Sequence, residues 1–410
     1  MYSSSNRQHI MRQSSGKTWN FFYDAKLGIC FNTLTRRGTW TNPVPLHKDG
    51  VQPFHAIIDN EDRFHILFQD RQGNISYSKI TGDSIETLPV LNSKTPSVYD
   101  KHLCLMQQGN IIHFFYVLKH GESWILAHQL LSGDKVENPR VIDYISYNSC
   151  PYSAVIDKSG DIYVFYPVSS SGSLQMGYKK YLPQKSWSEF AAISISEGDS
   201  GLPRTSVDAG NIVHISYQKY SQKQYSLMYQ QKVPGRNAWA PETVIHSSAY
   251  PFEDSAILCL KNSIIVFWVR SEIIYFSTSE NSGNTWSKPA RYNLPAGRQL
   301  FCISYRVNSL YDGEKTVINE IPGSFINGLR LAFLQDLPGN DANLSPEDLK
   351  NMIVESLKML NDSVEELKEA QEVLKDRILK LEHTQGGLEK ELAKISVRIS
   401  MLENQNKKLP

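Results

Sequence analysis

The chain has 410 residues, of which 40% are hydrophobic and 11% aromatic, enough for one large domain with an extension or for two domains. Its formal net charge of +1 argues against a large nucleic-acid footprint and gives no reason to expect attraction to anionic membranes. The N-terminus is polar, and no apolar run approaches the length of about 18 residues that a membrane span needs. These features predict a cytoplasmic protein without membrane insertion, or one that reaches a spore or phage surface by release after lysis.

The five cysteines are scattered along the chain, and none forms a Cys-x-x-Cys pair. Their number is odd, so the pattern indicates neither a disulfide framework nor a zinc site. We expect them to be small buried residues of a reduced protein. The sequence gives no other motif for a metal or a cofactor, and we predict none.

One short pattern, apolar residues alternating with variable ones and ending in an aromatic residue, recurs along the first 270 residues. The copies are Trp19–Tyr23, Phe64–Phe68, Ile112–Tyr116, Ile162–Tyr166, Val213–Tyr217 and Ile264–Trp268. Their starting positions of 19, 64, 112, 162, 213 and 264 are 45, 48, 50, 51 and 51 residues apart. Such regular self-similarity is typical of a repeat architecture.

The segments around each copy repeat as well. A short apolar strand ending in a polar turn precedes most copies, as at Ala56–Asp59 and Ala154–Asp157, and a third strand such as Ile75–Lys79 follows. A fourth segment often opens with a tryptophan, at Trp40, Trp187, Trp239 and Trp286. Four short strands in about 50 residues predict the blades of an all-β propeller over residues 1–336.

The two ends of the predicted propeller are less regular. Residues 8–13 can supply the first strand of the first blade, and residues 300–305 resemble the first strand of a seventh. Residues 316–318 and 329–333 can complete that last blade in degenerate form. We favour seven blades, with six as the alternative.

The turn of the sixth copy reads Ser-Glu-Asn-Ser-Gly-Asn-Thr-Trp. It resembles the Asp-box of sialidase-like propellers, Ser-x-Asp-x-Gly-x-Thr-Trp, with an asparagine where that family has aspartate. The matching residues are Ser279, Asn281, Gly283, Thr285 and Trp286. A short acceptor side chain caps such a hairpin and glycine allows positive φ, so the box is a structural element that does not imply catalysis.

The resemblance implies a possible sialidase-like activity, which needs an arginine triad, a tyrosine nucleophile with a glutamate, and an aspartate. The Phe/Tyr-Arg-Ile-Pro signature of those enzymes is absent from this chain. Arg12, Arg204 and Arg306 fall on predicted first strands with Tyr305 beside the last, and they either converge near the axis or bond between blades. We assign no catalytic residue and expect no enzyme activity.

Histidines occupy one repeat position in three copies, at His65, His113 and His214. A ring of metal ligands is one interpretation. Equivalent positions in neighbouring blades lie far apart, however, so we expect ordinary packing positions and no metal site.

The second strand of each copy ends in an aromatic residue followed by polar residues, on the face where the connections between blades lie. Aromatic rings beside amide and charged groups suit sugars, whose C–H faces stack while their hydroxyls form hydrogen bonds. The alternative is that the rings are wedges between the blades. The candidate ligand-binding residues on this rim are Tyr23, Phe68, Asp70, Tyr116, Tyr166, Tyr217, Trp268 and Arg270.

After a linker at 337–345, the composition changes to Leu, Glu, Lys and Ile, and Ser345-Pro346 is a strong helix start. Heptads predict a coiled coil over 346–407 that makes a dimer or a trimer, unless Gly386 and Gly387 turn the helix back on itself. The predicted contact residues are Leu360, Leu367, Leu374, Ile378, Leu381, Leu388, Leu392, Ile395 and Leu402.

Together these features favour a multivalent, non-catalytic protein that binds a carbohydrate or another surface ligand and presents its sites on an oligomeric coiled coil. One alternative is a scaffolding protein that binds a protein partner. The other is a sialidase-like glycoside hydrolase.

Overall fold

The computed structural model divides the chain into two compact units, Met1–Gly339 and Asn340–Pro410. The first unit is described over residues 2, 7–35, 39–94, 96, 99–170, 172–182, 186–194, 197–236, 238–252, 254–260, 263–292, 300–308, 316–325 and 329–334. The second is described over residues 368, 371–372, 374–375, 377–378 and 385–399.

The first unit consists of sheets in which most paired strands are adjacent in sequence and antiparallel. Two of them are β5–β8 (Gly50–Ile58, Phe64–Asp70, Ile75–Thr81, Ser84–Leu91) and β9–β13 (Cys104–Gln108, Ile111–His120, Ser123–Ser132, Lys135–Val136, Arg140–Ile145). Next come β14–β17 (Ser153–Ile156, Ile162–Ser170, Ser173–Lys180, Ala191–Ala192) and β18–β21 (Asp199–Val207, Val213–Ser221, Gln224–Lys232, Thr243–Ser248). The sheet β22–β25 (Ser255–Leu260, Ser263–Arg270, Ile273–Ser279, Ala290–Tyr292) follows. The repeated segments that end in an aromatic residue, from Phe64–Phe68 to Ile264–Trp268, lie on the second strands of these sheets.

The two ends of this unit share one seven-stranded sheet, in the order β28-β27-β26-β1-β2-β3-β4. Its strands are β1–β4 (Arg7–Arg12, Thr18–Asp24, Gly28–Thr33, Val44–His47) and β26–β28 (Phe301–Val307, Thr316–Ser324, Arg330–Leu331). The first strands β1 and β26 pair in parallel, with Ile10 opposite Tyr305. Among the described residues the strands therefore form seven repeat units, the last with three strands.

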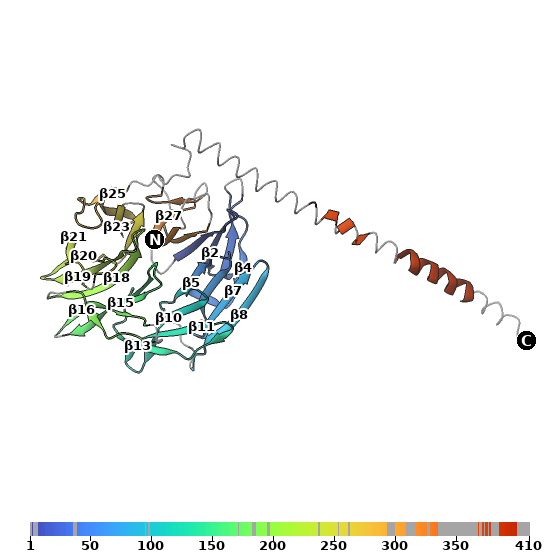
Figure 1. Cartoon of the computed structure of the whole chain (residues 1–410), viewed down its shortest axis with the longest axis horizontal. Coiled ribbons are helices and arrows are strands. Elements are labelled where there is room, and N and C mark those ends of the chain that lie inside the picture. The colour runs from blue at the N-terminus through green and yellow to red at the C-terminus, as the bar shows by residue number, and fades with distance from the viewer. Residues whose placement is uncertain are drawn as a thin grey trace, which may run out of the picture. The chain divides into compact units, whose positions relative to one another are not determined.

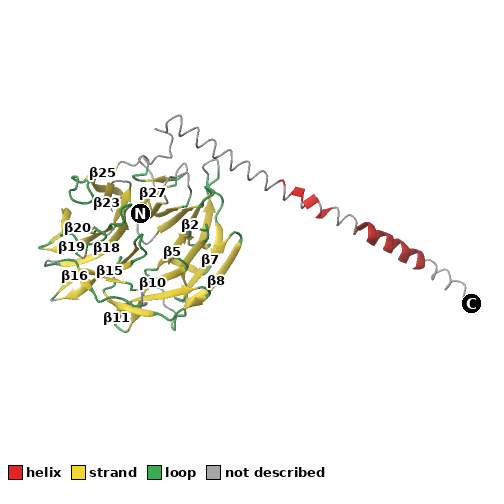
Figure 2. Ribbon diagram, in the orientation of Figure 1, coloured by secondary structure: helices red, strands yellow, loops and turns green. Residues whose placement is uncertain are grey.

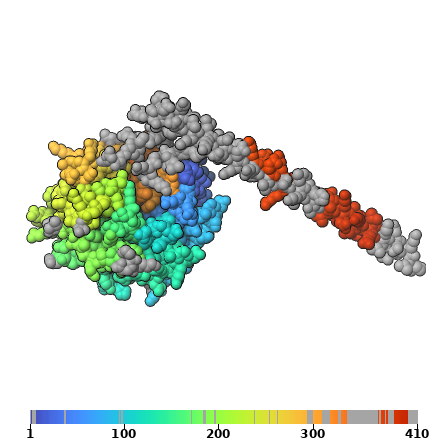
Figure 3. Space-filling view, in the orientation of Figure 1, coloured from blue at the N-terminus to red at the C-terminus, as the bar shows by residue number. Residues whose placement is uncertain are grey.

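The repeat units are arranged around a centre, as Figure 1 shows. First strands of consecutive units lie next to each other, as β14 does beside β18 and β18 beside β22. On the surface the colours pass around the unit in chain order (Figure 3), so units that follow one another in sequence are neighbours in space. This arrangement is a β-propeller, and the expected all-β fold is confirmed.

The hydrophobic core lies between the sheets. Each cluster of buried residues is shared by consecutive units, as where Phe115 of β10 meets Tyr152 and Ile162 of the next unit. The tryptophans of the fourth segments belong to these interfaces. Trp187 packs edge-on against Phe115 at 6.0 Å, and Trp239 packs against Phe165 at 5.4 Å. Burial of apolar surface between blades thus holds the ring together.

The turn between β24 and β25 is closed by side chains. The Ser279 hydroxyl accepts a hydrogen bond from the Gly283 N–H at 2.8 Å, and the Asn281 side-chain Oδ1 accepts one from the Thr285 N–H at 2.9 Å. Gly283 has φ +85°, and a Cβ there would lie 2.1 Å from the Tyr229 hydroxyl of the preceding unit. Trp286 packs on the same Tyr229 ring at 4.9 Å. The turn therefore docks its sheet onto the preceding one.

In the second unit, residues 385–399 form a continuous helix (Figure 2), and the other described residues of this unit are helical as well. Most of the remaining residues of the expected helix over 346–407 lie outside the described ones. Gly386 and Gly387 are both helical, so the alternative in which the chain turns back at this pair is wrong. Leu360, Leu367, Leu381 and Leu402 lie outside the described residues. No described helix has the length and apolarity to cross a membrane.

Candidate functional site

Most of the aromatic rings expected on the rim are buried between the sheets. Tyr116, Tyr166 and Tyr217 are fully buried, Phe68 and Trp268 are 6% exposed, and only Tyr23 is partly exposed. Strand residues at this position face the neighbouring sheet. This agrees with the alternative given above, in which the aromatic rings pack between the blades. A ligand on the rim therefore has access to few of these rings.

The polar ends of the buried tyrosines are used inside the protein. The Tyr166 hydroxyl donates to Asp143 Oδ2 at 2.8 Å, and the Tyr217 hydroxyl donates to Glu242 Oε1 at 2.5 Å. Asp70, another expected rim residue, accepts hydrogen bonds from the N–H groups of Gln72 and Asn74 and thereby shapes the turn after β6. These contacts assign structural tasks to residues that the sequence offered as ligand contacts.

The repeated histidines join short hydrogen-bonded chains within their own sheets. His65 lies between Asp59 at 2.9 Å and the Tyr77 hydroxyl at 2.6 Å, and His214 bonds the Tyr229 hydroxyl at 2.7 Å. No group of three or more metal-ligating side chains occurs among the described residues. Both ring nitrogens of His65 are thus engaged in hydrogen bonds within its own sheet.

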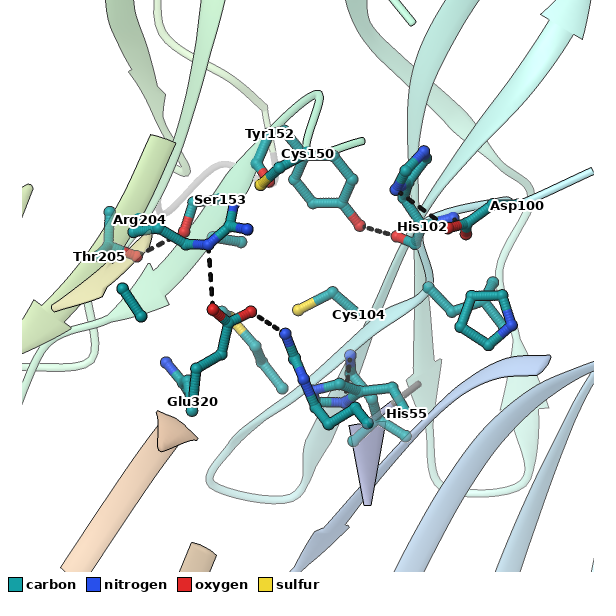
Figure 4. A pocket seen from close by; sticks show the side chains of 18 of the residues that line it. His55, Asp100, His102, Cys104, Cys150, Tyr152, Ser153, Arg204, Thr205 and Glu320 are labelled. Atoms are coloured by element: carbon teal, nitrogen blue, oxygen red, sulfur yellow. Dashed lines mark hydrogen bonds and ion pairs between the residues drawn. The ribbon is translucent and has the colours of Figure 1, made fainter. Parts of the chain in front are cut away.

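A cavity of about 160 Å³ lies on the axis of the ring; we call it the central cavity. Every repeat unit contributes to it through its first strand or the residues just before that strand, from Arg7 of β1 to Arg306 of β26. Figure 4 shows polar side chains of the residues that line it. They include His102 and Tyr152 from one side and Arg204 with Glu320 from the other.

Glu320 of β27 neutralises two arginines of the central cavity. Its carboxylate pairs with Arg204 Nε at 3.1 Å and also with Arg7 (Figure 4). Burial alone would lower the pKa of both guanidinium groups, but the Glu320 carboxylate helps to raise each pKa above its usual value. Arg7, Arg204 and Glu320 come from three separate repeat units, so this ion-paired cluster ties distant parts of the chain together.

The third arginine of the central cavity, Arg306, forms no ion pair with a described residue, and its Nε has no hydrogen-bond partner among them. Burial lowers its pKa to about 10. Of the arginines proposed from sequence, Arg204 and Arg306 converge here, whereas the Arg12 Nε donates to the Gly16 carbonyl at 3.3 Å. Tyr305 packs against a hydrophobic cluster.

Two groups of the central cavity are held in neutral forms. Burial lowers the pKa of His102, whose Nδ1 lies 3.5 Å from Asp100 and whose Nε2 has no partner among the described residues. Burial raises the pKa of Tyr152 well above its usual value, and its hydroxyl donates to the His102 carbonyl. Burial thus favours the uncharged form of both groups, with the imidazole beside Asp100 and the phenol hydroxyl bonded to the His102 carbonyl.

A second pocket, of about 270 Å³, lies on the outer part of the ring, between β21 and the face of β22–β25; we call it the rim pocket. Its lining residues are His246, Ser248, Tyr250, Pro251, Phe252, Trp268, Arg270, Tyr275, Pro289 and Arg291. It brings together Trp268 and Arg270, two of the expected rim residues. The other expected rim residues do not line it.

The rim pocket has an aromatic floor and an open side. The Trp268 ring lies between the His246 ring, stacked at 5.3 Å, and the Tyr275 ring, stacked at 6.0 Å. Phe252 meets Trp268 edge-on at 5.6 Å. Tyr250 at the mouth is 56% exposed, so its ring is accessible to a ligand.

Sequence reasoning missed Tyr250, Tyr275 and Arg291. Pairing across the sheet places Trp268 opposite Tyr275 and Tyr275 opposite Arg291, so these three side chains share one face. The signal available in sequence was the alternation of Trp268 and Arg270, two residues apart. The register that adds the others, and the neighbouring sheet that adds Tyr250, become known only from the three-dimensional structure.

No protein-family model matches the chain, and no curated protein matches it. Solved structures share its fold. A polysaccharide lyase, an ulvan lyase, is similar over 78% of this chain and 90% of its own, with a TM-score of 0.52 and 12% sequence identity. The lectin of Aleuria aurantia is similar over 72% of this chain and 99% of its own, with a TM-score of 0.42 and 14% identity. At these identities the likeness extends to the β-propeller fold alone.

Proposed function

We propose that this protein binds carbohydrate and that the rim pocket is its binding site. The observation that carries the proposal is an open pocket in which the exposed Tyr250 ring and the partly exposed Tyr275 ring stand beside hydrogen-bonding groups of His246, Ser248 and Arg270. Sugars bind such surfaces because their C–H faces stack on aromatic rings while their hydroxyls form hydrogen bonds.

The similarity to the ulvan lyase supports the proposal, because that propeller acts on a polysaccharide. Pocket shape supports it as well. The side chains that floor the rim pocket are fixed by stacking against one another, so little ordering is needed when a ligand binds.

A glycan array with the full-length protein tests the proposal, followed by titration of the best ligand against Tyr250→Ala. Loss of one stacked ring is expected to weaken binding about fivefold, from a stacking contribution of about 1 kcal/mol. Tyr144→Ala is the matched control, because Tyr144 is 59% exposed and lies on β13, outside the rim pocket. Absence of binding to any glycan, or equal losses in both variants, would refute the site.

We further propose that the C-terminal helix associates with a second copy of itself, so that the binding sites are presented in a multivalent form. The described heptad positions Leu374, Ile378, Leu388, Leu392 and Ile395 are 51–65% exposed in the single chain. Five apolar side chains at this spacing are stable only against another helix. A dimer or trimer would raise avidity for a surface that carries many copies of the ligand.

Sedimentation of the full-length protein tests the assembly. The double variant Leu388→Asn with Ile395→Asn is expected to sediment as a monomer, whereas Lys390→Asn, outside the heptad seam, is expected to sediment as the wild type does. The monomeric variant should keep its affinity for a free oligosaccharide and lose retention on a glycan-coated surface by a factor on the order of one hundred. A wild-type monomer would overturn the assembly and leave the glycan site standing.

A further inference from the structure

Two arginines line the rim pocket without an acidic partner among the described residues. Arg270 and Arg291 both line it, and among its described lining residues there is no aspartate or glutamate. Neither arginine forms an ion pair or a side-chain hydrogen bond with a described residue. This contrasts with arginines elsewhere in the propeller, such as Arg63 beside Asp59 and Arg140 beside Glu137.

The register of β22–β25 places both arginines on one face of the sheet. Arg291 lies opposite Tyr275, which lies opposite Trp268, and Arg270 follows Trp268 by two residues on the same strand. Side chains alternate between the two faces of a strand, so all four belong to the face that borders the rim pocket. The two guanidinium groups thus flank a single pocket.

Aromatic rings hold the two guanidinium groups in place. The Arg270 guanidinium carbon lies 3.8 Å from the centre of the Tyr250 ring, and that of Arg291 lies 5.6 Å from the centre of the Tyr275 ring. Stacking uses the flat face of a guanidinium and leaves the N–H groups at its edge free to donate. Fixed forks of N–H donors match the oxygens of a carboxylate or a sulfate ester.

We propose that the ligand of the rim pocket is an anionic saccharide, whose carboxylate or sulfate ester is bound by Arg270 and Arg291 while its ring stacks on the exposed Tyr250 ring. This inference rests on the proposed function and narrows its ligand class. A neutral sugar would leave the N–H groups of both guanidinium groups without an anionic acceptor. A single carboxylate or sulfate ester can accept hydrogen bonds from either arginine.

Three oligosaccharides of equal length separate the ligand classes: a chitin oligomer without charge, a hyaluronan oligomer with carboxylates only, and a carrageenan oligomer with sulfate esters only. Calorimetry with the full-length protein is expected to give affinity at least about tenfold higher for one anionic oligomer than for the neutral one. Which of the two anionic oligomers binds more tightly identifies the anionic group.

The variants Arg270→Lys and Arg291→Lys keep the charge and remove the planar fork. Each is expected to weaken binding of the anionic oligomer about tenfold and to leave the neutral oligomer unaffected. Arg236→Lys is the control, because Arg236 is exposed in the turn after β20 and lies outside the rim pocket. Unchanged affinity in both rim variants would show that general charge attraction is responsible and would overturn the proposal.

The failures of this inference and of the proposed function are distinguishable. Binding of the neutral oligomer as tightly as the anionic ones, lost in Tyr250→Ala, would overturn the anionic class and leave carbohydrate binding intact. Absence of binding to all three oligomers and to the glycan array would overturn both.

Discussion

The central cavity and the rim pocket both contain arginines, but two of the three central arginines are ion-paired, whereas Arg306 and the two rim arginines have no ion pair among the described residues. In the centre, Arg7 and Arg204 pair with the Glu320 carboxylate. At the rim, Arg270 and Arg291 are exposed, stack on tyrosine rings and have no acidic partner among the described lining residues. The ion-paired central arginines therefore stabilise the ring of sheets, whereas the rim arginines are available to a ligand.

The central cluster also has a topological role. Arg7 belongs to β1, Arg204 to β18 and Glu320 to β27, so one carboxylate joins units from the beginning, the middle and the end of the propeller. The buried apolar clusters, in contrast, mostly link consecutive units. We therefore expect the largest effects on stability at the centre and the largest effects on binding at the rim.

The strongest test of this division is Glu320→Gln, which keeps the shape of the side chain and removes its charge. Arg7 and Arg204 would then remain buried without a counter-charge, and the free energy of unfolding is expected to fall by about 3–5 kcal/mol. Urea unfolding followed by fluorescence measures the loss. Glu61→Gln is the control, since the Glu61 side chain is 68% exposed and pairs with Arg63 on the surface. Equal stability of the two variants would show that the central cluster does not hold the ring.

The second prediction concerns acid sensitivity of the centre. His9 is fully buried beside Arg7, and burial with the nearby arginines lowers its pKa from 6.5 to about 3. Because the folded pKa lies below the unfolded one, the neutral ring stabilises the fold above pH 6.5, and this contribution is lost as the pH falls towards 3. The loss is about 1.4 kcal/mol for each pH unit in that window.

Thermal unfolding at about pH 7 and about pH 4.5 measures this effect. His9→Gln cannot take up a proton, so it is expected to be less stable than the wild type at neutral pH and to lose less stability on acidification. His120→Gln, on the exposed end of β10, is expected to follow the wild type at both pH values. An unchanged pH slope in His9→Gln would place the acid sensitivity elsewhere.

The third prediction tests the sheet interface beside the rim pocket. Gly283 has φ +85°, and a Cβ would meet the Tyr229 hydroxyl at 2.1 Å, so Gly283→Ala combines backbone strain with a clash. The expected loss is about 2 kcal/mol in the free energy of unfolding. Gly235→Ala shares the positive φ of +77° and has no neighbour within 4 Å of its Cβ, so its loss should be about half as large. Equal losses of unfolding free energy in the two variants would mean that the Tyr229 side chain moves aside at little cost.

The propeller could be predicted from sequence because each blade repeats the same local pattern. The copies at Phe64–Phe68 and Val213–Tyr217 lie on β6 and β19, and the irregular ends at residues 8–13 and 300–305 lie on β1 and β26. The parallel pairing of β1 with β26 joins residues almost 300 positions apart, and no local pattern encodes it.

The sites were less accessible to sequence reasoning. The alternation of side chains along a strand identified Trp268 and Arg270 as candidates. It could not distinguish Trp268, which lines a pocket, from Tyr116 and Tyr217, which are buried against the neighbouring sheet. Arg7 and Glu320 carry no motif, and they meet Arg204 only because β1, β18 and β27, far apart in sequence, all border the central cavity. Periodicity therefore reports the fold, whereas packing between blades decides which repeated residues remain open to a ligand.

The smallest expected effect on stability is at the rim. Arg270→Lys and Arg291→Lys alter exposed side chains without an acidic partner, so each is expected to change the free energy of unfolding by no more than about 0.5 kcal/mol. The measurement is urea unfolding under the conditions used for Glu320→Gln. A loss above about 2 kcal/mol would mean that the stacked arginines support the sheet interface and would remove the contrast with the centre. If stability holds while affinity for an anionic saccharide falls, the charge at the rim serves the ligand, and the central cluster serves the fold.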